Sequence, residues 1–503
     1  MKIIELEELA KKVHDLKSRG NKVVHCHGVF DLLHIGHIRY VEQARRMGDI
    51  LIVTVTPDRY VDKGPHRPAF PEKLRAEALA SLNCVDFVAI NKWPTAEETL
   101  RLLRPNIYVK GSEFKNIASD PTGKIGHEEK VIREIGAKLA FTEDIVFSSS
   151  NLINRFFSSF PKEVDEYLSV FRNRYSLNEV LSYFDEMKNL KVLVIGDAIL
   201  DEYQYCDVIG KSSKDPILAL KYKNHDLFAG GVLANAGHIA TFADHVQLMT
   251  VLGDRNSYED FIRSQLHPNI VPRFFIQKNA PTTIKKRFIE GYSLNKLFEI
   301  YVMDESGLSS DESEKCLQWL KAILPEYDVV IVADYGHGAI NNNIIDILVQ
   351  EAKFLAINTQ ANAGNRGFNT ISRYPHADYI CIAEHEIRLE ARKLSENLHT
   401  LMLDIANKMN CNKFVVTQGR HGGTMLSNNE FLSVPSFAYN VVDRVGAGDA
   451  FFSLTSLAAV INIPDELILF MGNIAGCLSV ETIGNKKPVT KSEIQKYITS
   501  LMK

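Results

Sequence analysis

The chain has 503 residues, of which 45% are hydrophobic and 24% are charged, and its formal net charge is -4. A chain of this length exceeds one ordinary hydrophobic core, so we expect two or three globular domains. The small negative charge and the absence of a long basic run argue against nucleic acid or an anionic membrane as the main partner. Small molecules are therefore the expected ligands.

Cysteine usage and hydropathy predict the compartment. The seven cysteines are scattered and never spaced as Cys-x-x-Cys, so neither a disulfide framework nor a zinc site is indicated. No apolar run approaches 18 residues, and the first residues lack the apolar core of a signal peptide. We expect a cytoplasmic protein with buried thiols and no membrane-spanning segment.

Helix and strand patterns alternate over residues 1–160. Apolar spacing predicts a helix over residues 6–17, which Gly20-Asn21 ends. The next elements predicted are strands at 23–26 and 51–55, a helix at 74–82, a strand at 85–90, a helix at 96–103 and a strand at 107–109. Such alternation predicts a parallel sheet covered by helices.

The residue composition changes over residues 161–190, where charged and aromatic residues have helical spacing. Ser176-Leu177-Asn178-Glu179 fits a capping box that opens a helix. We interpret this segment as a helical linker. An apolar strand at 192–195 then begins a second α/β domain over residues 191–503, and the irregular, strand-rich stretch 203–227 predicts a small lid sheet beside its main sheet.

Two histidines mark the first candidate site. The turn Gly28-Val29-Phe30-Asp31 precedes His34-Ile35-Gly36-His37, which places both histidines at the N-terminal end of a helix, where backbone N–H groups attract phosphate. Imidazoles at that point can donate to phosphate oxygens as charge builds during displacement of pyrophosphate, each worth about 3 kcal/mol. Taken alone, the pair is also consistent with a metal site or with two satisfied surface histidines.

Further motifs identify a family for this half. Residues 23–156 resemble the cytidylyltransferase-like nucleotidyltransferases, and most closely the adenylyltransferase half of the bifunctional ADP-heptose synthases. The matching pieces are residues 28–37, Asp58, residues 63–68, Arg75, residues 109–112 and residues 148–153. The resemblance implies a Rossmann-like domain that binds a nucleotide and releases pyrophosphate.

The same resemblance implies roles for individual residues. His34 and His37 would steady the α-phosphate, Lys63 would contact the triphosphate or the sugar phosphate, and Lys110 and Gly111 would border the base. The remaining expected nucleotide and phosphate contacts are Gly28, Phe30, Gly36, Arg67, Arg75, Ser148, Ser149 and Ser150. Lys63, Arg67 and Arg75 together would place cations around a phosphate-binding cleft.

Alternatives remain open at several of these positions. Arg75 in a helix can instead pair with Glu72 or Glu77, and the serine triplet can be a plain helix N-cap. The family usually has Thr within the serine triplet and Asn where this chain has His27. These departures leave the choice between ATP and CTP open.

The second candidate site is the stretch Asp443-Arg444-Val445-Gly446-Ala447-Gly448-Asp449. Its small residues lie at a loop-to-helix junction, where backbone N–H groups can converge on a transferring phosphoryl group. A carboxylate at Asp449 can take the proton of an attacking hydroxyl. A glycine-rich turn with Asp is by itself also compatible with ordinary helix capping.

Residues 191–503 resemble the ribokinase-like carbohydrate kinases, again closest to the kinase half of the ADP-heptose synthases. The matches are residues 196–197, 200–203, 230–235, 334–338 and 417–419, and then the 446–449 signature. The resemblance makes Asp449 the base, with Asp197, Gly230, Gly231 and Asn235 at the sugar, and with Thr417, Gly419, Gly446, Ala447 and Gly448 at the nucleotide. Asp197 and Asn235 can instead cap local turns.

Three departures from the kinase pattern bear on activity. Asn358-Thr359-Gln360 stands where Asp-Pro-Lys is common, and Ala383 replaces the Asn of an Asn-x-x-Glu stretch whose Glu386 remains as an indirect metal ligand. Arg444 replaces the usual Thr, which adds a cation beside the phosphates or blocks part of the site. The order of the halves is also the reverse of that in the well-known heptose enzyme.

These patterns predict an α/β protein of two domains that makes a nucleotide-activated sugar, with ADP-heptose as the leading case. The resemblance implies a heptose 7-phosphate kinase joined to a heptose 1-phosphate adenylyltransferase. Mg²⁺ would serve both sites with ATP, or with CTP in the first, and a homodimer would form through the kinase lid. The alternatives are a cytidylyltransferase for another phosphorylated alcohol, and a kinase-like domain that is weakened or that binds sugar as a regulator.

Overall fold

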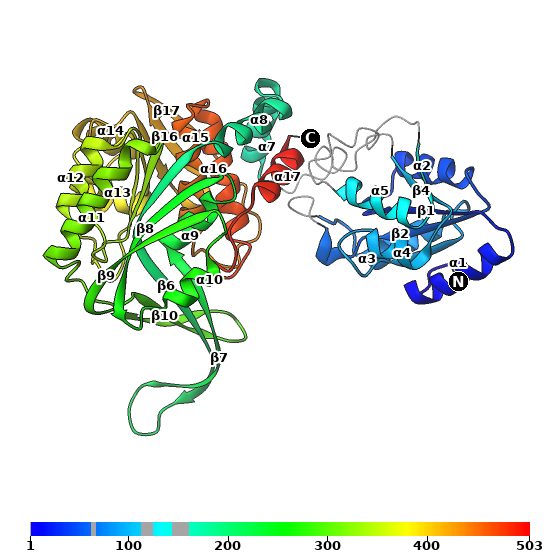
Figure 1. Ribbon diagram of the computed structural model, residues 1–503, viewed down its shortest axis with the longest axis horizontal. Coiled ribbons are helices and arrows are strands. Elements are labelled where there is room, and N and C mark those ends of the chain that lie inside the picture. Colours follow the sequence, from blue (N-terminus) through cyan, green and yellow to red (C-terminus); the bar gives the residue numbers. More distant parts are fainter. Residues whose placement is uncertain (1, 62–66, 112–123, 143–159, 503) are drawn as a thin grey trace. The chain divides into compact units, whose positions relative to one another are not determined.

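The computed structural model describes residues 2–61, 67–111, 124–142 and 160–502 (Figure 1). It divides into two compact units, residues 1–161 with 495–503, and residues 162–494. All seven cysteines are free thiols, six of them buried and Cys84 partly buried. Among the described residues, no helix combines the length and apolarity needed to cross a bilayer.

The first unit is built on a five-stranded parallel sheet in the order β3-β2-β1-β4-β5. Its elements are α1 (Leu6–Ser18), β1 (Val23–Gly28), α2 (Ile35–Arg45), β2 (Ile50–Val55), η1 (Asp58–Tyr60), α3 (Glu72–Ala80), β3 (Phe87–Ile90), α4 (Glu97–Leu103), β4 (Ile107–Lys110), α5 (Lys124–Glu134) and β5 (Lys138–Phe141). Because the chain leaves β1 in one direction and returns on its other side at β4, the strand order reverses between these two strands. Ligands of such sheets bind at the carboxyl ends of the strands beside that reversal.

The second unit opens with α7 (Lys162–Arg174) and α8 (Leu177–Lys188). They cover the stretch predicted as a linker, and they pack on the rest of the second unit: Phe171 stacks on Phe470 with ring centroids 4.1 Å apart. The predicted capping box is present, since the Ser176 hydroxyl accepts from the Glu179 amide at 3.2 Å and the Glu179 carboxylate accepts from the Ser176 amide at 3.3 Å.

The rest of the second unit alternates strands and helices around one large sheet. The strands are β6 (Lys191–Lys211), β7 (Leu218–Gly231), β8 (His245–Arg255), β9 (Ile270–Pro281), β10 (Ile284–Glu290), β11 (Lys296–Val302), β12 (Val329–Asp334), β13 (Leu355–Thr359), β14 (Tyr379–Ala383), β15 (Lys413–Thr417), β16 (Gly423–Ser427) and β17 (Glu430–Val434). The helices are α9 (Val232–Ile239), α10 (Glu259–Gln265), α11 (Ser310–Ile323), η4 (Leu324–Glu326), α12 (Asn342–Glu351), η5 (Ile371–Arg373), α13 (Glu384–Ala391), α14 (Leu398–Lys408), η6 (Gly419–His421), α15 (Ala447–Val460) and α16 (Asp465–Ser479). The last helix, α17 (Lys491–Leu501), begins in this unit, and its residues from 495 onward are grouped with the first unit.

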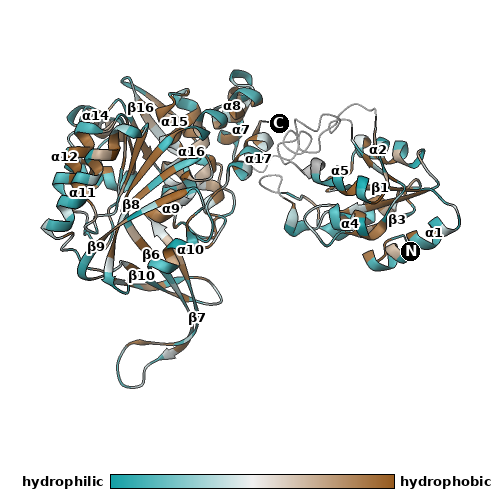
Figure 2. Ribbon diagram, in the orientation of Figure 1, coloured by the Kyte–Doolittle hydropathy of each residue, from teal (hydrophilic) through white to brown (hydrophobic). Residues whose placement is uncertain are grey.

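Successive side chains of the central strands point to opposite faces of the sheet, and helices cover both faces. Leu193 and Ile195 of β6 join the core beneath α11 to α14, whereas the intervening Val192 and Val194, also buried, are not part of that cluster. Helix α9 contacts β6 and β12, and helix α15 contacts β12 and β14. Figure 2 shows the resulting apolar centre, with hydrophobic strands between helices whose outer faces are hydrophilic.

The long strand β6 runs through two parts of this sheet. Its first residues pair in parallel with β8 and β12, and from Ala198 onward it pairs with β7 and β10. The continuation of β6 with β7, β10 and β11 forms the lid, so the predicted small sheet near residues 203–227 is confirmed. In Figure 1 the β6–β7 ribbon projects beyond the rest of this unit.

Candidate active sites

His34 is the N-cap of α2. Its Nδ1 accepts from the Gly36 amide at 3.1 Å, so the proton of the neutral ring lies on Nε2, which is then a donor. Burial lowers the pKa of His34, which favours this neutral form. One side chain at a helix start thus combines a capping acceptor with a second ring nitrogen that carries a proton, and helix starts bind phosphate.

His37 lies one turn further and stacks on His34, with ring centroids 4.0 Å apart. The Phe30 ring meets His37 edge-on at 5.4 Å, and Phe30 itself adopts a left-handed backbone with φ 50°. A Cβ on Gly28 would come within 3.2 Å of that ring. The Phe30 ring therefore packs against His37, and Gly28 leaves room for that ring because it has no Cβ.

Arg75 has a different environment from the predicted one. It is 2% exposed and donates to the carbonyl oxygens of Phe70, Val29 and Thr56 and to Asp58 Oδ1, the last at 2.5 Å. These acceptors engage Nε and both terminal nitrogens, so Arg75 connects the loops after β1 and β2, and its predicted contact with phosphate stays a prediction. Its carboxylate partner is Asp58, and neither Glu72 nor Glu77.

Two further cations of this unit have carboxylate partners. Arg67 lies 3.6 Å from Asp31, which also accepts from the Ala69 and Phe70 amides. Lys110 at the carboxyl end of β4 lies 2.8 Å from Glu128. Gly111 follows it at the same edge of the sheet as the His34 loop, as the prediction of a base-bordering pair requires. The predicted contacts Lys63, Ser148, Ser149 and Ser150 lie outside the described residues.

A buried polar ladder in this unit was not foreseen. Thr54 Oγ1 contacts His25 Nε2 at 2.8 Å and His27 Nδ1 at 2.9 Å, and Thr56 Oγ1 contacts His27 Nε2 at 3.2 Å. Burial lowers the pKa of His25 well below its usual value. His27, which departs from the family pattern, thus contacts β2 through one ring nitrogen and the residue directly after β2 through the other.

In the second unit, Asp449 lies in the first turn of α15, directly after the Gly446–Gly448 loop. Gly446 has φ 86°, and a Cβ there would come within 2.1 Å of Asn485 Oδ1, whereas a Cβ on Gly448 would meet open space. The first N–H groups of a helix have no intrahelical acceptor. The loop therefore presents backbone donors toward an accessible volume beside the carboxylate.

A hydrogen-bonded chain fixes Asp449. The Tyr335 hydroxyl donates to Asp449 Oδ1 at 2.6 Å and accepts from Asn235 Nδ2 at 3.1 Å. Asn235 also donates to the Gly231 carbonyl and accepts from the Ser453 hydroxyl at 3.0 Å. Asn235 is fully buried and its polar atoms belong to this hydrogen-bonded chain, while its predicted contact with sugar stays a prediction.

Burial raises the pKa of Asp449 to about 6, and the charge of Asp201 raises it as well. The Tyr335 and Asn235 hydrogen bonds and the Lys285 charge act in the opposite direction. A carboxylate with a pKa slightly below neutrality is ionised at pH 7 and still basic enough to take a proton in a transition state. This is the property expected of a kinase base.

The glycine motif before α9 packs against Asp201. A Cβ on Gly230 would come within 2.1 Å of Asp201 Oδ2, and Gly231 has φ 59° at the N-cap of α9. Asp201 is 3% exposed and pairs with Arg287 of the lid strand β10. Asp201 was not among the predicted site residues, although its place four residues after Asp197 in the same matched stretch was a usable signal.

Asp197 supports the loop that carries Tyr335. Its Oδ2 accepts from the Tyr335 amide and its Oδ1 from the Ala339 amide, both at 2.9 Å, and burial raises its pKa. The turn-capping alternative thus describes its observed contacts. Asp197 also lines a small pocket, so its predicted place beside the sugar is retained as a hypothesis.

Lys285 was also missed by sequence reasoning. It stands opposite Asp201 in the β10–β6 register and is 4% exposed, with its ammonium 5.3 Å from the Tyr301 ring centroid and 5.9 Å from that of Tyr335. Burial lowers its pKa, while the Asp201 charge raises it. Strand alternation alone could not reveal that this lysine faces the Asp449 site.

The remaining predicted kinase residues lie at the carboxyl edge of the sheet. Glu386 accepts from the Ala361 amide at 2.9 Å and the Ala383 amide at 2.7 Å, and burial raises its pKa to about 7. Thr417 ends β15, and Gly419 follows with φ 56° and open space around its Cα. Among the described residues, no cluster of three His, Cys, Asp or Glu side chains forms a protein cage for a metal.

The two units thus define a protein that joins a nucleotidyltransferase fold to a carbohydrate kinase fold. Residues 189–492 match the profile of the pfkB family carbohydrate kinases, and residues 25–156 match the cytidylyltransferase-like profile. The chain belongs to the pfkB family of carbohydrate kinases, and it carries a cytidylyltransferase-like domain before the kinase.

Curated relatives point the same way over a limited length. A protein named "Bifunctional protein HldE" from Desulfatibacillum aliphaticivorans is 34% identical over 154 residues, which are 30% of this chain and 30% of the relative. Another from Aliarcobacter butzleri is 39% identical over 137 residues, 27% of this chain and 28% of the relative. These alignments span less than a third of the relatives' length.

Solved structures resemble the kinase fold. Phosphofructokinase-2 from Escherichia coli in complex with potassium aligns with a TM-score of 0.53 at 15% identity, over 62% of this chain and 100% of that chain. Ribokinase from Thermotoga maritima aligns with a TM-score of 0.50 at 16% identity, over 62% of this chain and 99% of that chain. Likeness at these identities shows the fold alone.

Proposed function

We propose that this chain is a bifunctional enzyme that makes a nucleotide-activated sugar, with ADP-heptose as the leading product. The second unit would transfer the γ-phosphoryl group of ATP to a heptose 7-phosphate, giving the 1,7-bisphosphate. After a separate phosphatase has acted, the first unit would couple heptose 1-phosphate to the nucleotide and release pyrophosphate. The observation that carries the kinase half is Asp449, held by Tyr335 at the start of α15.

The kinase step follows from that geometry. Asp449 takes the proton of the acceptor hydroxyl, while the amides at Ala447 and Gly448 and the α15 dipole stabilise charge on the transferring phosphoryl group. Asp201 and Arg287 lie where the lid meets the glycine motif and supply polar groups for the sugar. Bound Mg²⁺ would neutralise triphosphate charge, held mainly by phosphate oxygens and water with Glu386 nearby.

The nucleotidyl step rests on the α2 start. His34 and His37 stack there, and His34 offers an Nε2 donor because its Nδ1 is engaged with Gly36. Donors at this position stabilise the α-phosphate as the sugar phosphate attacks and pyrophosphate leaves. The location at the β1–β4 reversal is where doubly wound sheets bind nucleotides.

The proposal is tested by separating the two half-reactions. Purified protein with ATP and heptose 7-phosphate should give a bisphosphate by ³¹P NMR, and with ATP and heptose 1-phosphate should release pyrophosphate. Asp449→Asn should remove the first reaction and leave the second, and His37→Ala the reverse. Loss of both reactions in either variant would contradict two independent sites.

The cytidylyltransferase alternative is decided by the nucleotide. Pyrophosphate release with CTP but not with ATP, on glycerol or pentitol phosphates, would replace the ADP-sugar proposal. The regulatory alternative is favoured by Asn358, whose side chain donates to the Cys381 carbonyl at 2.7 Å and so is engaged in the sheet. The absence of ATP consumption by the wild type across a panel of sugars would favour a kinase-like domain that binds sugar as a regulator.

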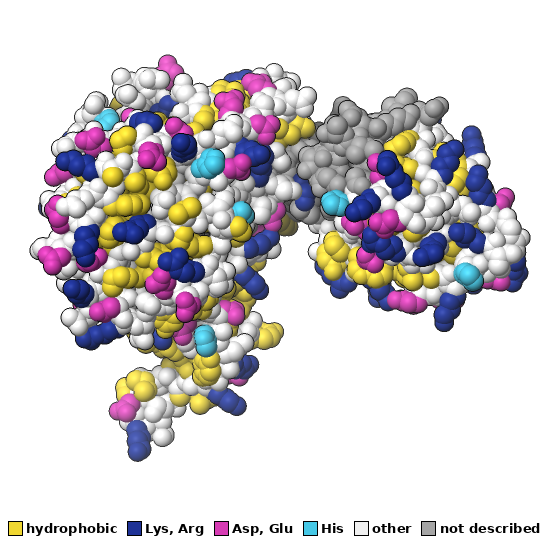
Figure 3. Space-filling view, viewed as in Figure 1, with side chains coloured by type: hydrophobic (Ala, Val, Ile, Leu, Met, Phe, Trp, Pro, Cys, Tyr) yellow, Lys and Arg dark blue, Asp and Glu magenta, His cyan; other side chains and the backbone are white. Residues whose placement is uncertain are grey.

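We also propose that the protein is a homodimer through its lid. The β6–β7 ribbon exposes apolar side chains, which Figure 3 shows in yellow along its surface. They include Ile209 at 66%, Ile217 at 60% and Leu218 at 50% exposure. Burial of this surface against a second copy would remove it from water. Light scattering on Ile209→Glu should report a monomer where the wild type is a dimer.

The free thiols support placing the protein in the cytoplasm.

A further inference from the structure

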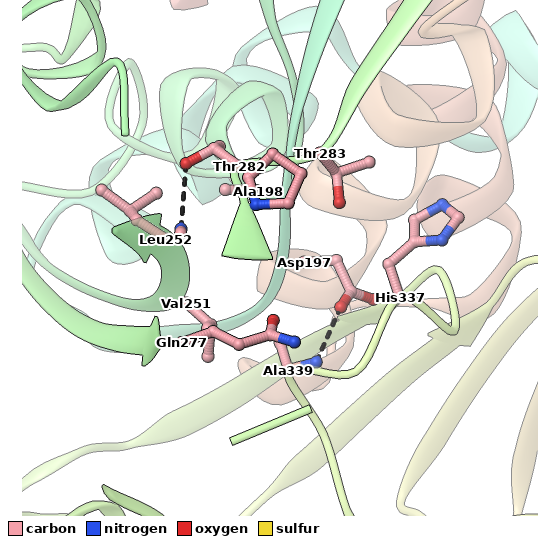
Figure 4. Close-up of a pocket in the computed structure, with 11 residues that line it drawn as sticks. Asp197, Ala198, Val251, Leu252, Gln277, Thr282, Thr283, His337 and Ala339 are labelled. Atoms are coloured by element: carbon pink, nitrogen blue, oxygen red, sulfur yellow. Dashed lines mark hydrogen bonds between the residues drawn. The ribbon is translucent and has the colours of Figure 1, made fainter. Parts of the chain in front are cut away.

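A small pocket lies beside Asp197 at the carboxyl end of the central strands. It is enclosed by β6, by β8, by β9 and the turn that follows it, and by the loop after β12 (Figure 4). Its lining residues are Asp197, Ala198, Val251, Leu252, Gly253, Gln277, Pro281, Thr282, Thr283, His337 and Ala339. The pocket has room for about one water-sized group.

His337 is the unusual member of this lining. It is 5% exposed, and neither Nδ1 nor Nε2 has a hydrogen-bond partner among the described residues. Flanking Gly336 and Gly338 have φ 70° and 97°, and a Cβ on Gly364 would come within 3.2 Å of the His337 ring. Buried polar groups are nearly always satisfied, so both ring nitrogens are available to a group that enters the pocket.

The chemistry of the pocket selects the class of that partner. Burial and the nearby Lys285 charge lower the pKa of His337 to about 3, so the ring is neutral and presents one donor and one acceptor. An alcohol group donates and accepts in the same way. Thr283 adds a hydroxyl, and in the view of Figure 4 it lies with the His337 ring on the same side of the Asp197 carboxylate.

The pocket is linked to the kinase base through one residue. The Tyr335 amide donates to Asp197 at 2.9 Å, and the Tyr335 hydroxyl donates to Asp449 at 2.6 Å. The pocket and the base are therefore separated by about the length of one tyrosine side chain. A sugar whose reacting hydroxyl meets Asp449 spans such a distance with a hydroxyl further along its carbon chain.

We propose that this pocket is a hydroxyl subsite of the kinase, in which His337 binds one alcohol group of the sugar, on a carbon distant from the one that is phosphorylated. The inference rests on the proposed function, because it assigns a contact to that same substrate. It deepens the proposal by making the kinase selective for a polyhydroxylated chain long enough to reach both Asp449 and His337.

Ring-¹⁵N-histidine NMR tests the subsite without requiring turnover. The His337 resonances are assigned by their loss in His337→Gln, and a heptose 7-phosphate is then titrated into the wild type. Both ring nitrogens should shift while remaining in the neutral range. His238 is the internal control, since it is equally buried but its Nδ1 already accepts from the Val489 amide at 3.0 Å. Its resonances should stay in place.

Kinetics supply the second readout. His337→Leu should fold, because it removes two unsatisfied nitrogens, and should raise KM for the heptose phosphate about tenfold with kcat little changed. His337→Gln, which keeps a donor and an acceptor, should lose less. Unchanged ring shifts together with an unchanged KM in His337→Leu would overturn the subsite while leaving the proposed kinase intact.

Two further outcomes separate the claims. Equal shifts produced by inorganic phosphate, or a ring that becomes protonated on binding, would overturn the assignment of a hydroxyl. Failure of the wild type to phosphorylate any sugar offered would reject the proposed function, and the titration would still report whether His337 meets a sugar.

Discussion

The Tyr335 hydroxyl should set the basicity of Asp449, and Tyr335→Phe tests this. The substitution deletes the donor 2.6 Å from Asp449 Oδ1 and leaves the ring in place. A hydrogen bond to a charged group contributes about 1.5–3 kcal/mol, which corresponds to roughly one to two pKa units. Because this bond stabilises the ionised carboxylate, its loss should raise the pKa of Asp449 from about 6 toward 7 or 8.

The sign of that shift determines the assay. Asp449 acts as a base only when ionised, so the acidic limb of the kinase pH–rate profile should move to higher pH by about one to two units. At pH 6 the variant should be about five- to fiftyfold slower than the wild type, and the difference should narrow toward pH 9. ADP release coupled to a sugar phosphate acceptor measures both proteins across this range.

Tyr374→Phe is the matched control. The Tyr374 hydroxyl donates to Asp334 Oδ2 at 2.8 Å, in the same buried Tyr–Asp arrangement but without contact to Asp449. It should lose stability without shifting the acidic limb. If Tyr335→Phe and Tyr374→Phe show the same pH profile as the wild type, Tyr335 does not control the base and the reasoning fails.

Three further substitutions test the remaining assignments. His34→Asn keeps an N-cap acceptor for α2 but lacks the Nε2 donor, so the melting temperature should hold while pyrophosphate release falls about a hundredfold. A lower melting temperature in this variant would show that capping was the main role of His34. Arg75→Met should destabilise the first unit by about 3 kcal/mol in chemical denaturation, because Asp58 and three carbonyls lose their donor. A fully stable variant with weakened nucleotide binding would instead support a contact between Arg75 and phosphate. Burial raises the pKa of Glu386 from 4.5 to about 7, so the folded state binds more protons between these values than the unfolded state does. The free energy of unfolding should therefore fall by up to about 3 kcal/mol as the pH rises from 4.5 to 7. Glu386→Gln should reduce this pH dependence in thermal melts at pH 4.5 to 8, and an unchanged dependence would show that Glu386 is not its source.

Local patterns were sufficient for much of the fold. The apolar spacing of the first helix, the strand at 23–26 and the capping box at Ser176 all depend on neighbours in sequence, and the structure confirms them. The first predicted helix boundary lies within one residue of the observed end at Ser18. The lid was also predicted, because its irregular, strand-rich stretch differs from the alternation around it.

The candidate sites were only partly predictable. His34 at a helix start and Asp449 after a glycine loop are local features, and their placement is as expected. Arg75 was assigned to phosphate because charge alone cannot show which acceptors surround it. Its carbonyl partners come from loops up to 46 residues away, and only packing brings them together.

By itself the sequence determined where phosphate-binding loops begin helices, since capping and backbone donors depend on a few adjacent residues. Tertiary structure alone decided which side chains meet across the sheet. Tyr335 reaches an aspartate 114 residues away, Lys285 faces Asp201 through strand register, and His337 closes a pocket made by four segments. Such contacts depend on the closure of long loops and on burial, which no local pattern encodes.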